Sequence, residues 1–218
     1  MTRETFDRLL SELQQQLLKL SSMVEGTIHL AVESLAKQDQ DLAQQIIDAD
    51  DQIDDLVRKI EADCIRVIAL QQPLARDLRV VTTVLRIALD LERIADNASN
   101  IAEITIRIGK QPLIGQLEDI PKMAELAETM VRKSIKALVD RDAAAAKANC
   151  LQDERVDEIY RALLNETTDF VMGDADRAAV VQGINLLFVA RFLERVADHA
   201  TNIGERVIYL VTGRNEHY

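Results

Sequence analysis

Apolar residues recur along this chain at steps of three and four positions, which is the period of one face of an α-helix. In the first half of the chain the pattern forms three runs, from Phe6 to about Ala36, from Leu42 to Ile68, and from near Pro73 to about Ile108. Polar residues at 38–41 separate the first two runs. A proline is tolerated in the first turn of a helix, so we expect Pro73 to open the third helix.

The second half of the chain repeats this order after a candidate linker. The segment from Gly109 to Pro121 holds two of the three prolines and two of the seven glycines, a composition that interrupts helices. Three more periodic runs predict helices at roughly Lys122 to Val139, Ala143 to Met172 and Asp176 to Val211. The sequence therefore predicts an all-α fold of two tandem three-helix bundles, residues 1–110 and 116–218.

Two matching segments indicate that the second bundle is a copy of the first. They begin at Leu91 and Leu193, 102 residues apart, and nine of their thirteen positions are identical. The acidic segments at 50–55 and 153–158 also match, at an offset of 103 residues. A repeat at about half the chain length is typical of an internal duplication. We therefore expect the two bundles to be related by duplication.

The charge and hydropathy of the chain limit its partners. A formal net charge of −11, with no run of Lys or Arg, repels a phosphate backbone, so we expect no nucleic acid partner. No apolar run approaches the roughly 20 residues that span a bilayer, and the N-terminus lacks a signal-peptide pattern. We expect a cytoplasmic protein that is peripheral to the membrane through partners only. The isolated cysteines Cys64 and Cys150 form no metal-binding motif and are expected in the core.

Oxygen-bearing side chains form a stripe on the third helix of each half. Its members are Glu92, Asp96, Asn100 and Glu103 in the first half, and Glu194, Asp198, Asn202 and Glu205 in the second. An α-helix turns about 100° per residue, which places each stripe on one face, away from the apolar residues and toward solvent. Carboxylates four residues apart repel one another unless a cation lies between them. Carboxylate and amide oxygens suit hard divalent or trivalent cations, namely iron, manganese, magnesium or calcium.

The second helix of each half could complete such a metal site. Its acidic residues are Asp50 and Asp54 in the first half, and Asp153 and Asp157 in the second. His199 lies beside the stripe and could also join. The alternative is a solvated acidic face, neutralised by Arg93 and Arg195, on a helical scaffold without metal.

The sequence offers no visible catalytic machinery. It has neither a nucleophile with a base at a recognisable spacing nor a glycine-rich phosphate loop. A ferritin-like di-iron enzyme would need Glu-x-x-His motifs on inward-facing helices, and none of His29, His199 and His217 follows a glutamate by three positions. We therefore expect a protein that catalyses no reaction.

These motifs resemble those of the PhoU family of phosphate-signalling regulators, over essentially the whole chain. The resemblance is carried by Val24-Glu25, Ile53-Asp54, the turn at 71–79, Asp90 to Asp96, and Asn100 to Ala102. The chain departs from the commonest family pattern at Ala95 and Ala197, where glycine often stands. Phe192 stands where a counterpart of Asp90 is expected, so the two halves differ.

The resemblance implies metal clusters, iron among them, held by pairs of E/DxxxD motifs. By position, the implied ligands are Asp50, Asp54, Glu92 and Asp96 in the first half, and Asp153, Asp157, Glu194 and Asp198 in the second, with Asn100 and Asn202 extending each stripe. It also implies an adaptor between the ATPase subunit of a phosphate ABC transporter and a sensor histidine kinase, which keeps phosphate-starvation genes off when phosphate is plentiful. We further expect a homodimer. An accessory protein of another phosphate transporter stays open as the alternative.

Overall fold

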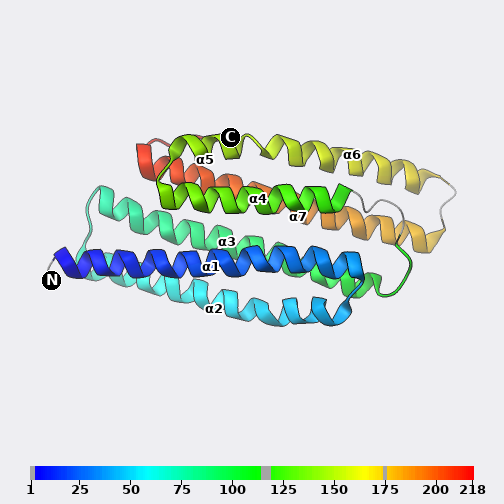
Figure 1. The fold of residues 1–218 in the computed structure, drawn as a ribbon, viewed down its shortest axis with the longest axis horizontal. Helices are drawn as coiled ribbons and strands as arrows, with labels where there is room; N and C mark the ends of the chain where they lie inside the picture. The colour runs from blue at the N-terminus through cyan, green and yellow to red at the C-terminus, as the bar shows by residue number, and fades with distance from the viewer. Residues whose placement is uncertain (1–2, 114–118, 174–175) are drawn as a thin grey trace.

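Long α-helices account for the fold of the part of the chain that the computed structural model describes, namely residues 3–113, 119–173 and 176–218, with side chains from residue 6 (Figure 1). The helices are α1 (Arg3–Lys37), α2 (Gln40–Gln71), α3 (Arg76–Ile108), α4 (Asp119–Asp140), α5 (Ala143–Cys150), α6 (Asp153–Met172) and α7 (Arg177–Thr212). The fold is all-α, as predicted.

The helices form two bundles that lie side by side along their length. α1, α2 and α3 pack against one another in the first bundle, and α4 to α7 form the second (Figure 1). α3 packs on α7 and α1 packs on α4, so four helices form the seam between the bundles. This arrangement confirms the prediction of two tandem bundles related by duplication. The boundaries 1–110 and 116–218 stay a prediction.

Capping residues explain where several helices begin and end. The Leu42 N–H donates a hydrogen bond of 3.0 Å to the side chain of Asp39, which caps α2. The Ala179 N–H donates one of 2.8 Å to the side chain of Asp176, which caps α7. Gly213 ends α7 in the left-handed conformation, with a φ of 76°.

Two predicted boundaries are wrong by a few residues. α3 begins at Arg76 instead of Pro73, because Gln72 and Ala75 have φ angles of 44° and 46°, which a right-handed helix does not accommodate. α4 begins at Asp119, so Pro121 lies in its first turn and not in the linker. A proline fits there because its missing N–H has no partner in a first turn.

The prediction of one helix from Ala143 to Met172 is also wrong, because the chain bends between α5 and α6 at Leu151 and Gln152. The bend lets the buried side chain of Asn149 donate hydrogen bonds of 2.8 Å to the Met130 carbonyl and to Ser134 Oγ, both on α4. Leu151 and Gln152 keep near-helical backbone angles. The apolar periodicity therefore continues through the bend and hides it.

One continuous apolar core runs through both bundles. Its members include Leu20 of α1, Ile60 of α2, Ile94 of α3, Met130 of α4 and Val196 of α7. Cys64 and Cys150 are buried, as predicted, and burial raises the pKa of these thiols to about 12 and about 11. Among the described residues, none of the helices is long and apolar enough to cross a membrane.

Candidate metal-binding carboxylate clusters

The first bundle brings four predicted ligands close to one another. Asp50 and Asp54 of α2 lie near Glu92 and Asp96 of α3, and we call these four residues the N-terminal cluster. Burial raises the pKa of Asp50, and the carboxylates of Asp96 and Asp54 raise it further. Burial also raises the pKa of Glu92, with Asp96 and Asp54 adding to the effect of burial and Arg93 opposing it. The cluster thus concentrates negative charge where water solvates it poorly.

The second bundle repeats this arrangement with Asp153 and Asp157 of α6 and Glu194 and Asp198 of α7, which we call the C-terminal cluster. Burial, together with the carboxylates of Asp198 and Asp157, raises the pKa of Asp153 to about 6. Burial and the carboxylate of Asp198 raise the pKa of Glu194 as well. The duplication therefore places an equivalent acidic cluster in each bundle.

Three carboxylate oxygens of these clusters are buried and accept no hydrogen bond of normal geometry, although the nearby Ser99 hydroxyl lowers the pKa of Asp50 slightly. They are Oδ1 of Asp50, Oδ1 of Asp153 and Oε2 of Glu194. Asp50 and Asp153 are equivalent residues of the two repeats, so the same atom is unpaired in both clusters. A buried acceptor without a donor costs about 1–3 kcal/mol, a cost that a bound cation relieves. Oxygen donors of this kind fit a hard cation.

The clusters do not already have the geometry of a closed metal site. In the part of the chain that the structure describes, no three Asp, Glu, His or Cys side chains converge closely enough to hold a metal ion. Carboxylates repel one another until a cation lies between them, so side-chain rotation would have to accompany binding. The oxygen donors, their burial and their repetition in both bundles suit a hard cation. In the present side-chain conformations, however, the ligands of each cluster are too far apart to share one ion.

The stripe is less exposed than the helical pattern predicts. In the second bundle Glu194 is 9% exposed and Glu205 is 8% exposed, so the expectation of a solvent-facing stripe is wrong for these two residues, whereas Asp198 is exposed as expected. α7 contacts α3, α4, α5 and α6, so neighbouring helices cover more of its circumference than one apolar face. In the first bundle Glu92 and Asp96 are half-buried, and only Glu103 is exposed.

Arginines balance part of the charge in each cluster. Nη1 of Arg93 lies 3.0 Å from Oδ2 of Asp96. Nη1 of Arg191 contacts Oε1 of Glu194, and its guanidinium lies 5.8 Å from the centre of the Tyr160 ring. The sequence pattern identified Arg93 but missed Arg191, whose position three residues before the motif gave no distinct signal.

The outer residues of the stripe have other partners. Nδ2 of Asn100 donates a hydrogen bond of 2.8 Å to the backbone carbonyl of Asp96. Glu205 accepts one of 3.0 Å from the Tyr218 N–H, and its other oxygen lies 3.2 Å from Nδ1 of His217. Asn202 is half-buried. Asn100 and Asn202 stay predicted ligands, and Glu205 is held by the C-terminal residues.

His199 is part of the seam between the bundles instead of the stripe. Its Nδ1 lies 3.1 Å from Oδ1 of Asp90, which belongs to α3 in the first bundle. Both side chains are mostly buried, with exposed fractions of 18% and 15%. The pair joins residues 109 positions apart, and periodicity along one helix carries no information about such a contact.

The fold and the paired acidic clusters define a duplicated helical-bundle protein with one carboxylate motif pair in each copy. The family model of the PhoU domain matches this chain twice, at residues 17–105 and 120–207, once in each bundle. The chain belongs to the PhoU family, which confirms the resemblance seen in the sequence.

Named relatives and solved structures agree over nearly the whole chain. The phosphate-specific transport system accessory protein PhoU homolog of Clostridium acetobutylicum is 39% identical over 215 residues, which cover 98% of this chain and 97% of the relative. The homolog of Aquifex aeolicus is 40% identical over 204 residues, covering 94% and 91%. The crystal structure of PhoU from Pseudomonas aeruginosa is similar with a TM-score of 0.92 at 34% identity, covering 96% of this chain and 100% of that one. That of PhoU from Streptococcus pneumoniae has a TM-score of 0.91 at 31% identity, covering 98% and 100%.

Proposed function

We propose that this protein is an accessory protein of a phosphate transport system that restrains phosphate uptake and phosphate-starvation signalling when phosphate is plentiful. The observation that carries the proposal is its similarity, over nearly the full length of both chains, to relatives named as accessory proteins of phosphate-specific transport. The protein acts in the cytoplasm as a homodimer and catalyses no reaction. It connects the ATPase subunit of a phosphate ABC transporter to a sensor histidine kinase.

Exposed apolar side chains at one end of the first bundle support a role in binding other proteins. Ile65 and Leu70 of α2 are 56% and 57% exposed, and Leu74 in the following turn is 81% exposed. Large apolar side chains that gather on a surface in this way are typical of protein contacts. A Leu74→Glu variant should weaken binding to the purified ATPase subunit or kinase. Leu151→Glu is the matched control, because Leu151 is likewise an exposed leucine in a turn, 60% exposed, and lies in the second bundle.

A deletion strain tests the regulatory role directly. A reporter of phosphate-starvation genes should be active at high phosphate in cells that lack the protein, and the wild-type chain should restore repression. An unchanged reporter would contradict the proposal. Restored repression without an effect on the ABC transporter would favour the alternative of an accessory protein for another phosphate transporter.

We also propose that both clusters bind hard cations. The ligands are Asp50, Asp54, Glu92 and Asp96 in the N-terminal cluster, and Asp153, Asp157, Glu194 and Asp198 in the C-terminal cluster, with Asn100 and Asn202 beside them. The unpaired buried oxygens and the concentrated negative charge support this assignment. Bound metal would neutralise charge that now opposes the packing of α2 on α3 and of α6 on α7.

Elemental analysis of purified protein tests the metal proposal. The double variant Glu92→Gln/Asp96→Asn should lower the content of iron, manganese, magnesium or calcium and keep its helical circular dichroism. The control Glu158→Gln/Glu166→Gln removes the same charge from exposed positions of α6 and should keep its metal. Equal metal content in both variants would refute the ligand assignment. A wild-type protein without metal would favour the plain helical scaffold.

A further inference from the structure

Arginines gather in a cleft at the seam between the bundles, although the chain as a whole has a net charge of −11. This cleft, which we call the seam cleft, has a volume of about 480 Å³ and is lined by Arg79 and Arg86 of α3 and by Arg206 and Tyr209 of α7. An adjoining cavity of about 350 Å³ shares Arg79 and adds two further arginines, Arg76 and Arg141. The two bundles thus enclose a basic surface made from residues distant in sequence.

Helical spacing and aromatic stacking position these arginines. Arg79 and Arg86 are seven residues apart on α3 and so share one face, and Arg206 lies three residues before Tyr209 on α7. The guanidinium of Arg79 lies 5.4 Å from the centre of the Tyr209 ring, which holds it across the seam. A Cβ at Gly213 would come within 2.7 Å of Nη1 of Arg79, so glycine lets the chain pass close to this guanidinium.

The charges in the seam cleft are not neutralised by the protein. Among the ion pairs of the described residues, none involves Arg79, Arg86 or Arg206. Nε of Arg206 is buried and has no hydrogen-bond partner. An unsatisfied buried N–H on a charged group is costly, and an anionic acceptor removes that cost.

Three carboxylates on the elements beside the cleft have other partners, and a fourth, Asp77 in the first turn of α3, is not free either. Asp90 lies against His199, and Glu205 accepts from the Tyr218 N–H. Glu216, next to the cleft residue Asn215, lies 3.6 Å from Nζ of Lys147. An external anion is therefore the group that can satisfy the seam arginines.

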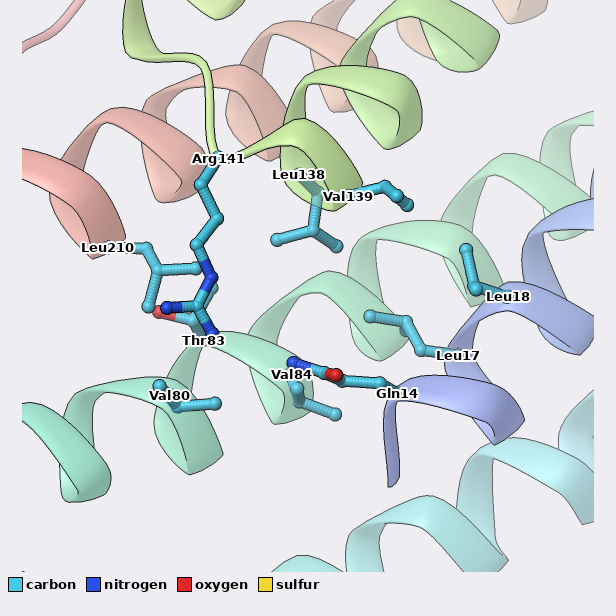
Figure 2. Close-up of a pocket in the computed structure, with 10 residues that line it drawn as sticks. All are labelled: Gln14, Leu17, Leu18, Val80, Thr83, Val84, Leu138, Val139, Arg141 and Leu210. Carbon is cyan, nitrogen blue, oxygen red and sulfur yellow. The ribbon is translucent and has the colours of Figure 1, made fainter. Parts of the chain in front are cut away.

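A neighbouring cavity shows how the α4–α5 turn adds positive charge beside the cleft. Figure 2 shows the side chain of Arg141 extending from that turn past Leu210 toward Thr83, and Thr83 also lines the seam cleft.

The N-terminus of α3 also borders the cleft. Ala75, at the start of α3, lines the cleft, and no side chain caps that helix end. The exposed N–H groups of a helix N-terminus attract an anion, although Asp77 in the first turn of α3 offsets part of this attraction.

We propose that the seam cleft binds a small anion that carries two or more phosphate groups. Guanidinium groups pair with phosphate oxygens through two parallel hydrogen bonds, which suits the three arginines of the cleft. The volume is within the usual range for small-molecule sites, roughly 300–1,000 Å³, and exceeds what one phosphate fills. Because the arginines come from both bundles, the bound anion ties α3 to α7. The proposal is independent of the metal clusters and adds a ligand to the regulatory role.

Calorimetric titration of the purified full chain tests this proposal. The probes are inorganic pyrophosphate and ATP, with orthophosphate and sulfate as single-anion comparisons. The variant Arg86→Gln/Arg206→Gln should bind pyrophosphate or ATP at least about tenfold more weakly, because it removes two groups that form charged hydrogen bonds with the phosphates. The control Arg66→Gln/Arg177→Gln removes two exposed arginines outside the cleft and should change affinity less than about twofold. Circular dichroism checks folding, and Arg206→Lys, which keeps the charge but loses the paired geometry, should bind with intermediate affinity.

The outcomes separate the possible ligands. Tighter binding of ATP than of pyrophosphate supports a nucleotide ligand, and the reverse supports an inorganic polyphosphate. Equal affinity for sulfate or orthophosphate, or an equal loss in both double variants, would overturn the proposal because it would indicate attraction by charge alone. Binding of a polyglutamate peptide but of neither probe would overturn it in favour of a protein-docking surface. None of these results alters the deletion phenotype, so the regulatory role is tested separately.

Discussion

Replacing Asp153 with Asn should stabilise the metal-free protein at neutral pH. Burial, with Asp198 and Asp157 nearby, raises the pKa of this carboxyl from 3.8 to about 6. An acid with a higher pKa in the folded state than in the unfolded chain holds its proton more tightly when folded, so its ionisation near pH 7 weakens the fold. Asparagine keeps the shape of the side chain and removes the charge.

The size of this effect follows from three contributions. A shift of roughly two pKa units corresponds to about 3 kcal/mol. Asp153 is half-buried, so we reduce this value by about half for solvent screening. Asp153 is also the first residue of α6, and loss of its charge there removes roughly 0.5 kcal/mol of interaction with the helix dipole. The net gain is about 1 kcal/mol, or about 2–4 °C in the midpoint of thermal unfolding for a chain of this size.

Thermal unfolding measured by circular dichroism across a pH series checks this prediction. The difference between Asp153→Asn and wild type should be small below the unfolded pKa of 3.8, grow as the pH rises through about 6, and then level off. Glu158→Gln, an exposed change on the same helix, should stay within about 0.5 kcal/mol of wild type. An unchanged or lower midpoint at pH 7, or a difference that does not depend on pH, would refute the electrostatic argument. Added Mn²⁺ should favour wild type, because Asp153 is a proposed ligand.

Three further predictions concern packing within the two bundles and at the seam. Gly204→Ala should cost about 1–3 kcal/mol in urea denaturation, because the new Cβ would lie 2.5 Å from Sγ of Cys150; an unchanged unfolding free energy would contradict this packing. The native protein should react with a thiol reagent at neither Cys64 nor Cys150 until it unfolds, because both are buried with raised pKa values; rapid labelling would show otherwise. His199→Ala should cost about 1–3 kcal/mol, because it leaves Asp90 mostly buried without its partner, whereas a neutral effect would mean that the pair does not stabilise the seam.

Periodicity along the chain was enough to predict the helices but not their interruptions. The apolar pattern follows one face of each helix, and it continues through Leu151 and Gln152, where the backbone stays near-helical. The bend depends on Asn149 reaching Met130 and Ser134, which is a tertiary contact. Pro121 suggested a linker because a first-turn proline and a loop proline look the same in sequence.

The composition of the carboxylate clusters was predictable, because the duplicated motif repeats the same residues in both halves. Their burial was not, since the exposure of Glu194 depends on how many helices surround α7. The contact of His199 with Asp90 and the seam cleft were missed for a related reason. Both join residues from different halves, and the packing of one bundle on the other brings them together.

The contact of α3 with α7 joins equivalent helices of the two repeats, so each repeat supplies half of one shared interface. A single repeat produced alone would leave this surface open and would be expected to self-associate. Because the two copies are covalently linked, each is always at a high effective concentration near the other. Their contacting residues can therefore differ between the two repeats. Their divergence is visible at one equivalent pair of positions, where Asn97 bonds to its own helix while His199 reaches across to the other repeat.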